Sequence, residues 1–175
     1  VVMSNEVGYP EALDVVGYNY QEYRYDADHK KYPQRIIYGS ENGMQYAAWK
    51  AVTDNDYIAG QYLWTGIDYL GEARTWPSKS NSAGLIDLAG FKKPDFYFRQ
   101  SLWTDKPMIW IGTSFLSKSK NTQNIMSSWN YKEGDSIRVT CFTNCDAAEL
   151  FINGKSLGKK QLAVAAEKVI TWNVV

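Results

Sequence analysis

The stretch RIIYGSENG, from Arg35 to Gly43, joins a strand signal to a single acidic group. Its β-branched and aromatic run is typical of a buried strand, and the run stops at Gly39 and Ser40. The carboxylate of Glu41 follows directly. In parallel β/α proteins the carboxyl ends of the strands carry the chemistry. The stretch therefore predicts a parallel strand with Glu41 at its functional edge, although an acid here would also suit the first turn of a helix.

Two further apolar runs flank this strand in the sequence. They read LDVVGYNY (Leu13–Tyr20) and YIAGQYLWTGIDY (Tyr57–Tyr69). Helical patterns follow the three runs in turn, at Gln21–Tyr32, Met44–Asn55 and Pro94–Trp103. Strands that alternate with helices over short connections predict right-handed parallel β/α units.

The hydrophobic period changes to two after Pro107, which is typical of antiparallel strands. Four short alternating runs are separated by turn signals such as KEGD and NGKSLG. The runs are Met108–Gly112, Ser136–Asn144, Ala148–Gly154 and Lys168–Val175. We therefore expect an α/β domain over residues 1–106 and a partial immunoglobulin-like β-sandwich over residues 107–175. Three β/α units cannot close an eight-stranded barrel, so we expect both parts to be truncated.

Composition excludes several classes of partner. The formal net charge of the 175 residues is zero, which argues against a nucleic-acid phosphate backbone as partner. No apolar run reaches the roughly 20 residues that span a bilayer, so no membrane partner is expected. Cys141 and Cys145 lie ~13 Å apart if their segment is a strand, too far for a disulfide without a turn. We interpret both as free, mostly buried thiols.

Polar and aromatic side chains gather at the ends of the predicted strands. Asn19 and Tyr20 end the first strand, whereas Trp64 and then Asp68 lie towards the end of the third. Amide and hydroxyl groups suit sugar hydroxyls, and an indole packs against the C–H face of a sugar ring. A carboxylate beside them, such as Glu41, can attack or stabilise an oxocarbenium centre. This pattern indicates a sugar site.

Several motifs together resemble glycoside hydrolase family 2, and in particular its bacterial β-galactosidases. They are DVVGYNY, IIYGSENG, GQYLWTGIDYLGE, SAGLIDLAGFKKPDFYFRQSLW and MSSWNYKEGDSIRVTCFTNCDAAELFINGKSLG. The resemblance implies the last three β/α units of a TIM (β/α)8 barrel, followed by an immunoglobulin-like domain. It implies that Glu41 is the catalytic nucleophile and that Tyr20, also catalytic, hydrogen-bonds it. It further implies that Asn19 and Trp64 form part of the sugar pocket.

The implied function is that of a retaining exo-β-glycosidase that releases terminal β-galactose through a covalent glycosyl-Glu41 intermediate. Such an enzyme also needs an acid/base carboxyl roughly 5 Å from the nucleophile. Glu6 follows an Asn, as the acid/base does in the family, but only one predicted strand separates it from Glu41. We interpret Glu6 as a solvated residue, and we expect the isolated chain to be inactive because its acid/base is missing.

Other assignments stay open at this point. Trp76, in a long loop, and Asp68 are expected to line the substrate pocket. A non-catalytic carbohydrate-binding or adhesion module is one alternative, and β-glucuronidase or β-mannosidase activity is another. No metal ligands are evident, although some members of the family bind Mg²⁺ or Na⁺. We expect a carbohydrate partner in a bacterial periplasmic or extracellular setting, and leave open a homo-oligomer.

Overall fold

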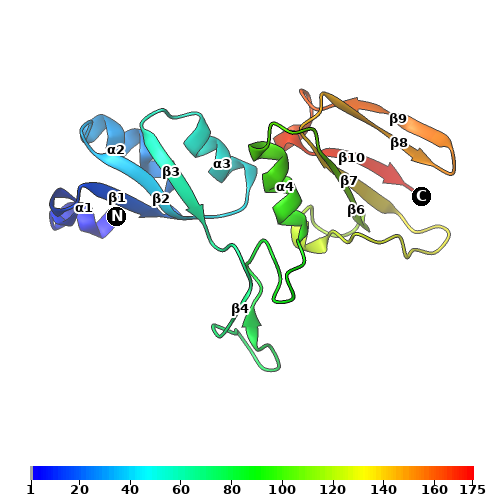
Figure 1. The fold of residues 1–175 in the computed structure, drawn as a ribbon, viewed down its shortest axis with the longest axis horizontal. Coiled ribbons are helices and arrows are strands. Elements are labelled where there is room, and N and C mark those ends of the chain that lie inside the picture. Colours follow the sequence, from blue (N-terminus) through cyan, green and yellow to red (C-terminus); the bar gives the residue numbers. More distant parts are fainter. Residues whose placement is uncertain (1) are drawn as a thin grey trace. The chain divides into compact units, whose positions relative to one another are not determined.

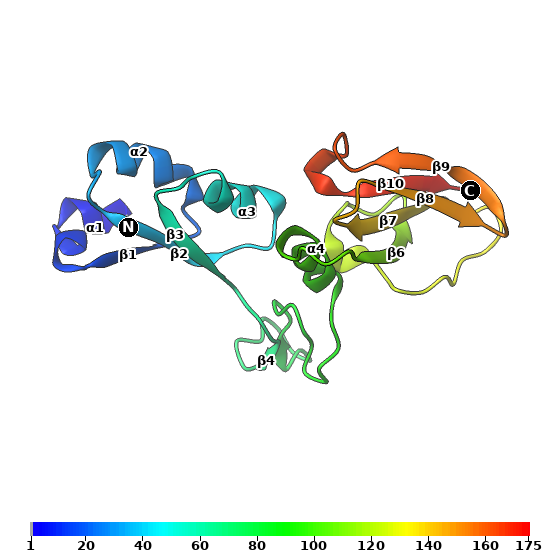
Figure 2. The same ribbon diagram turned by 45° about the horizontal axis from the view of Figure 1, so that its top comes forward.

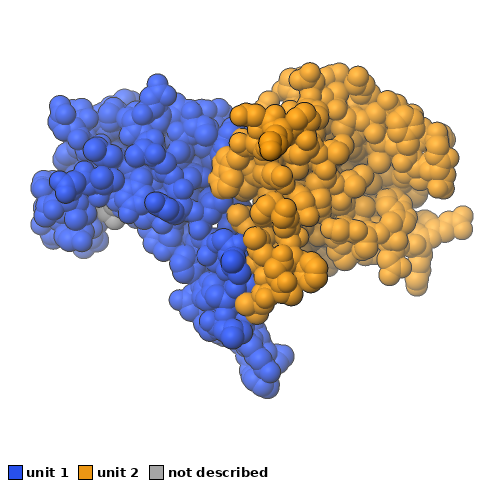
Figure 3. Space-filling model, viewed as in Figure 1, with its two compact units in different colours: residues 1–84 blue, residues 85–175 orange. Residues whose placement is uncertain are grey.

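The computed structural model describes residues 2–175, which divide into two compact units, Val1–Gly84 and Leu85–Val175 (Figure 3). The division falls earlier in the chain than the domain boundary expected at residue 106. Helix α4 (Pro94–Trp103) therefore belongs to the second unit. The assignment of residues 1–106 to one domain and 107–175 to another stays a prediction.

The first unit contains a three-stranded parallel sheet (Figure 1). Its strands are β1 (Val15–Asn19), β2 (Ile36–Asn42) and β3 (Ile58–Leu63), in the order β1-β2-β3 with both neighbours parallel. The prediction of parallel β/α units is confirmed for these strands. The helical elements of this unit are α1 (Val2–Glu6), η1 (Tyr9–Ala12), η2 (Glu22–Arg24), α2 (Tyr25–Lys31) and α3 (Tyr46–Thr53).

Helices α2 and α3 cover one face of this sheet (Figure 2). Val16, Tyr18 and Ile37 point from the strands into the shared core, where Tyr25 of α2 and Val52 of α3 meet them. Burying apolar area of this kind stabilises the fold by about 25 cal/mol per Å². The helix-covered face is therefore the hydrophobic side of the unit.

A polar network ties α2 to the strands beneath it. Asp28 is 4% exposed and accepts hydrogen bonds from the hydroxyl of Tyr18 at 2.9 Å and from the amide of Asn5 at 3.2 Å. Arg24 adds an ion pair at 3.1 Å. Burial pushes the pKa of Asp28 up, but the hydrogen bonds from Arg24, Tyr18 and Asn5 lower it by more. The network satisfies a buried charge that would otherwise be costly.

The segment predicted as one strand over Tyr57–Tyr69 is divided in the structure. β3 ends at Leu63, and a separate two-stranded ladder, β4 (Tyr69–Leu70) with β5 (Ser80–Asn81), follows. The two strands bracket an exposed loop over residues 71–79. The peptide bond between Trp64 and Thr65 is cis, and so is the bond between Trp76 and Pro77.

The second unit contains two antiparallel sheets. One has the order β10-β7-β6, formed by β10 (Ile170–Val174), β7 (Ile137–Thr143) and β6 (Ile109–Phe115). The other pairs β8 (Ala147–Ile152) with β9 (Lys155–Gln161), and the 3-10 turns η3 (Thr122–Asn124) and η4 (Ala166–Lys168) lie in the connections. The predicted antiparallel region is thus confirmed, while β9 begins within NGKSLG, the stretch expected to form a turn.

The core of the second unit lies between its two sheets. Val139, Cys141 and Trp172 of one sheet meet Ala148 and Leu150 of the other. On the opposite face of β7, aromatic rings join the sheet to α4. The ring centroids of Phe98 and Phe142 lie 5.3 Å apart, and Tyr97 stacks on Trp110 with a centroid distance of 5.1 Å. These contacts explain why α4 belongs to the second unit.

The two cysteines have different environments. Both are free, as expected, but only Cys141 is buried, whereas Cys145 is exposed because it lies in the turn after β7. The expectation that both thiols are mostly buried is therefore wrong for Cys145. Within residues 2–175, no helix combines the length and apolar character needed to cross a bilayer.

Candidate active site

The strand that carries Glu41, β2, has one residue that the pairing with its neighbour β1 skips. Tyr18 pairs with Gly39, but the next residue, Asn19, pairs with Glu41, so the ladder passes over Ser40. An extra residue in one strand of a pair is a β-bulge, which bends the strand and re-aims its side chains.

The ladder with β3 shows the same irregularity, between Gly39 and Asn42. Ile37 faces the helix-covered core, and strict alternation along β2 would send residue 41 to the same face. The bulge gives that place to Asn42, which is 0% exposed and whose amide lies 3.4 Å from the hydroxyl of Tyr25. Glu41 is half-buried and turns away from the helices. The bulge is therefore what directs the candidate nucleophile out of the core.

Tyr20 lies against Glu41 through both its backbone and its side chain. Its amide nitrogen donates to the carbonyl oxygen of Glu41 at 2.8 Å. Tyr20 has a φ of 51°, a left-handed conformation that costs a non-glycine residue about 1–3 kcal/mol and is concentrated at functional sites. Burial, the negative charge of Glu41 and a hydrogen bond to its carboxylate raise the pKa of the Tyr20 hydroxyl. The left-handed turn thus places the phenol of Tyr20 near the Glu41 carboxylate.

Trp64 reaches the site from the end of β3. Its amide nitrogen donates to the carbonyl oxygen of Asn42 at 3.1 Å, which fixes the backbone of Trp64 beside the end of β2. The indole is half-buried and meets the ring of Tyr69 edge-on at 5.7 Å. The structure therefore gathers the predicted residues Tyr20, Glu41 and Trp64 at the carboxyl ends of three adjacent strands.

The other predicted site residues have different surroundings. Asn19 is exposed beside Glu41. Asp68 is only 9% exposed, and its carboxylate accepts a hydrogen bond from the amide of Gly84 at 2.8 Å, which gives it a structural role in the loop. Trp76 is 83% exposed in the loop of residues 71–79, with the ammonium of Lys79 5.8 Å from the centre of its ring. Substrate contacts of these three residues stay predictions.

Comparisons with known proteins place the chain among glycosidases. Beta-galactosidase BoGH2A of Bacteroides ovatus is 43% identical over 115 residues, or 64% of this chain and 12% of that protein. A putative beta-glucuronidase of Formosa agariphila is 38% identical over 118 residues, or 63% of this chain and 10% of that protein. The crystal structure of a glycosyl hydrolase family 2 member from Bacteroides cellulosilyticus matches 95% of this chain and 25% of its own, with 32% identity and a TM-score of 0.83. The chain belongs to glycoside hydrolase family 2.

Two further matches extend this assignment. Residues 117–175 match a family model described as a domain of unknown function (DUF4982). The crystal structure of a beta-glycosidase from Bacteroides vulgatus covers 93% of this chain and 27% of its own length, at 25% identity and a TM-score of 0.75. The chain spans only about a tenth of the length of the curated relatives above, 12% and 10%. It is therefore much shorter than the family 2 proteins that it matches.

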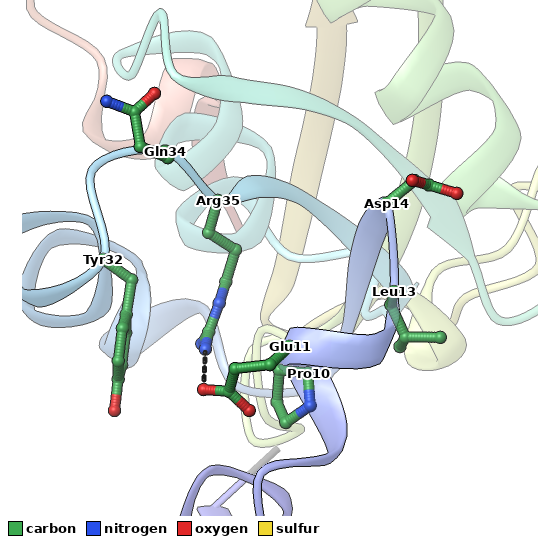
Figure 4. Close-up of a pocket in the computed structure, with 7 residues that line it drawn as sticks. All are labelled: Pro10, Glu11, Leu13, Asp14, Tyr32, Gln34 and Arg35. Atoms are coloured by element: carbon green, nitrogen blue, oxygen red, sulfur yellow. Dashed lines mark ion pairs between the residues drawn. The ribbon is translucent and has the colours of Figure 1, made fainter.

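The edge of the sheet opposite Glu41 carries a separate pocket of about 310 Å³ (Figure 4). Residues before β1 and β2 line it, and an ion pair of 3.7 Å between Arg35 and Glu11 crosses it. Arg35 also donates to the side chain of Asn5 at 2.8 Å, so the end of α1 lies at this edge. Glu6, the last residue of α1, is exposed there and is not near the strand ends that carry Glu41. The interpretation of Glu6 as a solvated residue agrees with this position.

Sequence reasoning did not single out Tyr69, whose ring lies against that of Trp64. It falls within a run interpreted as a continuous strand, in which only Asp68 was singled out as an acid. The signal that was available is the spacing of two aromatic residues, Trp64 and Tyr69, around the flexible Gly66. Among residues 2–175, no group of three or more His, Cys, Asp or Glu side chains is arranged to hold a metal ion.

Proposed function

We propose that the full-length protein containing this chain is a retaining exo-β-glycosidase that hydrolyses terminal β-galactosides. The observation that carries this proposal is the bulge in β2, which turns Glu41 out of the core and against Tyr20, beside Trp64. A carboxylate that accepts a phenol hydrogen bond next to an indole is suited to attack on a sugar ring held by that indole.

In the proposed mechanism, a Glu41 carboxylate oxygen attacks the anomeric carbon as the glycosidic C–O bond breaks. An acid/base residue outside this chain gives its proton to the departing oxygen. The same residue then removes a proton from water, which attacks the anomeric carbon and releases Glu41. Tyr20 donates its hydrogen bond to Glu41 and holds the carboxylate in position for attack. Because the acid/base lies elsewhere, the 175-residue chain alone is expected to be inactive.

The proposed architecture is the last three β/α units of a TIM barrel joined to part of an immunoglobulin-like sandwich. Uncovered apolar surface on the strands supports it. Ile111 pairs with the buried Cys141 and lies on the same face of the sheet, yet it is 50% exposed, and Ile109 is 68% exposed. Val15 at the edge strand β1 is 43% exposed. Both sheets thus leave surface that further strands of a larger protein would cover.

Galactose is the proposed sugar because the relative at 43% identity is a beta-galactosidase. A β-glucuronidase is the second candidate, supported by the putative beta-glucuronidase at 38% identity. Both candidates use the same nucleophile, so the assignment of Glu41 does not depend on the choice between them.

The test uses the full-length protein and a 2-fluoro-β-galactoside with a good leaving group, which traps a glycosyl intermediate. The expected result is a labelled Glu41 peptide in the mass spectrum and retention of anomeric configuration by NMR. Glu41→Gln should lower kcat by about 10³-fold or more while sugar binding persists. Glu11→Gln, at the opposite edge of the sheet, is the matched control with unchanged kcat. A label on another residue, or full activity of Glu41→Gln, would refute the assignment.

A further inference from the structure

Tyr69 forms a wall of the candidate site, and its hydroxyl holds an acidic side chain there. Its ring stands at 85° to the indole of Trp64 with a centroid distance of 5.7 Å. Its backbone pairs with Asn81 across the β4–β5 ladder, which fixes the position of the ring. Its hydroxyl donates a hydrogen bond to Glu72. Tyr69 therefore links the indole platform to a carboxylate.

The backbone around Glu72 is shaped to bring this carboxylate back to Tyr69. Gly71 and Glu72 both adopt left-handed conformations, with φ values of 94° and 45°. Such consecutive positive φ values reverse the chain tightly, at a cost for the non-glycine residue. The reversal places the Glu72 side chain over the tyrosine three residues earlier. The carboxylate is exposed, so its charge faces the solvent that a ligand would replace.

Two carboxylates, those of Glu72 and Glu41, act on the hydroxyl of Tyr69. Burial above all, then a hydrogen bond to Glu72 and the charges of Glu72 and Glu41, raise the pKa of Tyr69 to about 12, while the Asn81 side chain lowers it. The charge of Glu41 thus extends to Tyr69. The loop also carries two cations, the exposed Arg74 and Lys79, and the ammonium of Lys79 lies over Trp76.

We propose that Glu72, held by the hydroxyl of Tyr69, makes this side of the sugar pocket acidic and selects neutral sugars over uronic acids. A sugar packed on Trp64 meets the Tyr69 wall, and a carboxylate at C6 of the sugar would be repelled by Glu72. A neutral hydroxymethyl group would instead find acceptors in the Glu72 carboxylate. The inference rests on the proposed function and decides between its two candidate substrates.

The experiment measures kcat/KM of the full-length protein for 4-nitrophenyl β-galactoside and 4-nitrophenyl β-glucuronide. The wild type is expected to favour the galactoside. Glu72→Gln should raise the glucuronide-to-galactoside ratio about tenfold, because one like charge near the sugar carboxylate is removed. Tyr69→Phe keeps the ring and frees Glu72, and it should raise the ratio by a smaller factor. Discrimination by the wild type should also weaken at about 1 M salt, where charges are screened within about 3 Å.

Glu133→Gln, an exposed acid in the turn before β7, is the control variant and should leave the ratio unchanged. An unchanged ratio in both Glu72→Gln and Tyr69→Phe would overturn the inference while leaving the galactosidase proposal intact. The inference would also be overturned if the wild type prefers the glucuronide and Lys79→Gln abolishes that preference. Lys79 would then be the residue that selects the sugar, by binding its carboxylate. Hydrolysis of neither substrate by the wild type would instead refute the proposed function, on which the inference rests.

Discussion

The amide of Tyr20 donates to the carbonyl oxygen of Glu41 across 2.8 Å, and the Glu41 carboxylate contributes to the raised pKa of the hydroxyl of the same residue. Tyr20 is thus fixed to the backbone of the candidate nucleophile, and its hydroxyl lies near the carboxylate. Because the left-handed φ of Tyr20 turns the chain directly after β1, the ring reaches the neighbouring strand instead of continuing along its own.

We predict that Tyr20→Phe lowers kcat/KM of the full-length protein about 10- to 100-fold. A hydrogen bond to a charged group contributes about 1.5–3 kcal/mol, which corresponds to that range of rates. Tyr62→Phe, on the exposed side of β3, is the control because its side chain is 69% exposed. An equal loss of activity in both variants would show that the hydrogen bond to Glu41 is unimportant.

Gly39→Ala is predicted to destabilise β2 by about 1–3 kcal/mol, because the new methyl group overpacks a filled site. A Cβ at this position would lie 2.1 Å from the side-chain oxygen of the buried Asn42. The midpoint temperature of thermal unfolding should fall. The kcat should fall as well, because a shift of Asn42 also moves Glu41, which directly precedes it. Gly66→Ala is the matched control, because no atom lies within 4 Å of its added Cβ. Equal thermal stability of the two variants would contradict the predicted clash.

The stability of the first unit should depend on pH through Asp28. Its pKa is lowered in the folded chain, so it contributes stability above the unfolded pKa of about 4 and loses that contribution as the pH falls below it. Asp28→Asn should therefore cost about 1–3 kcal/mol at pH 7 and much less at pH 3. Urea unfolding followed by circular dichroism at both pH values measures the difference. If Asp28→Asn lowers the free energy of unfolding equally at pH 7 and pH 3, the charge of the carboxylate does not contribute to stability.

Thiol reactivity should separate the two cysteines. Burial, with a smaller effect of Cys145, raises the pKa of Cys141 to about 11, so its thiolate is scarce at pH 8. Cys145 is exposed and should react at once with 5,5′-dithiobis(2-nitrobenzoate), whereas Cys141 should react only after denaturation. Cys145→Ser should abolish the fast phase. Absence of both phases without reductant would point to a disulfide.

Short-range sequence patterns predicted the helix before Pro107 and the three parallel strands. The helix Pro94–Trp103 was predicted with the bounds that the structure has, because Pro94 marks its first turn. The three parallel strands followed from their apolar runs. The division of Tyr57–Tyr69 was missed, because β3 ends at Leu63, where the chain leaves its partner β2, and the apolar pattern continues through Trp64 and Ile67.

The sequence predicted which residues form the candidate site but not how their side chains are oriented. Tyr20, Glu41 and Trp64 were identifiable from their places at strand ends and from the resemblance. Their orientation depends on the irregular register of β2 against both neighbours, a property of strand pairing that the residues of β2 alone do not encode. Tyr69 was missed for a related reason, since its hydrogen bond to Glu72 depends on a reversal of the backbone.

The extra residue in β2 has a consequence for how the strand can pair. If Asn19 paired with Ser40 in place of Glu41, alternation along β2 would be regular and the last two side chains would exchange their surroundings. The acid would then be pressed against Tyr25, and the amide would face away from the helices. Loss of the Ser40 codon would instead remove the bulge while the acid and the amide kept their faces, so the register of the pairing sets the direction of the acid and the identity of residue 40 does not.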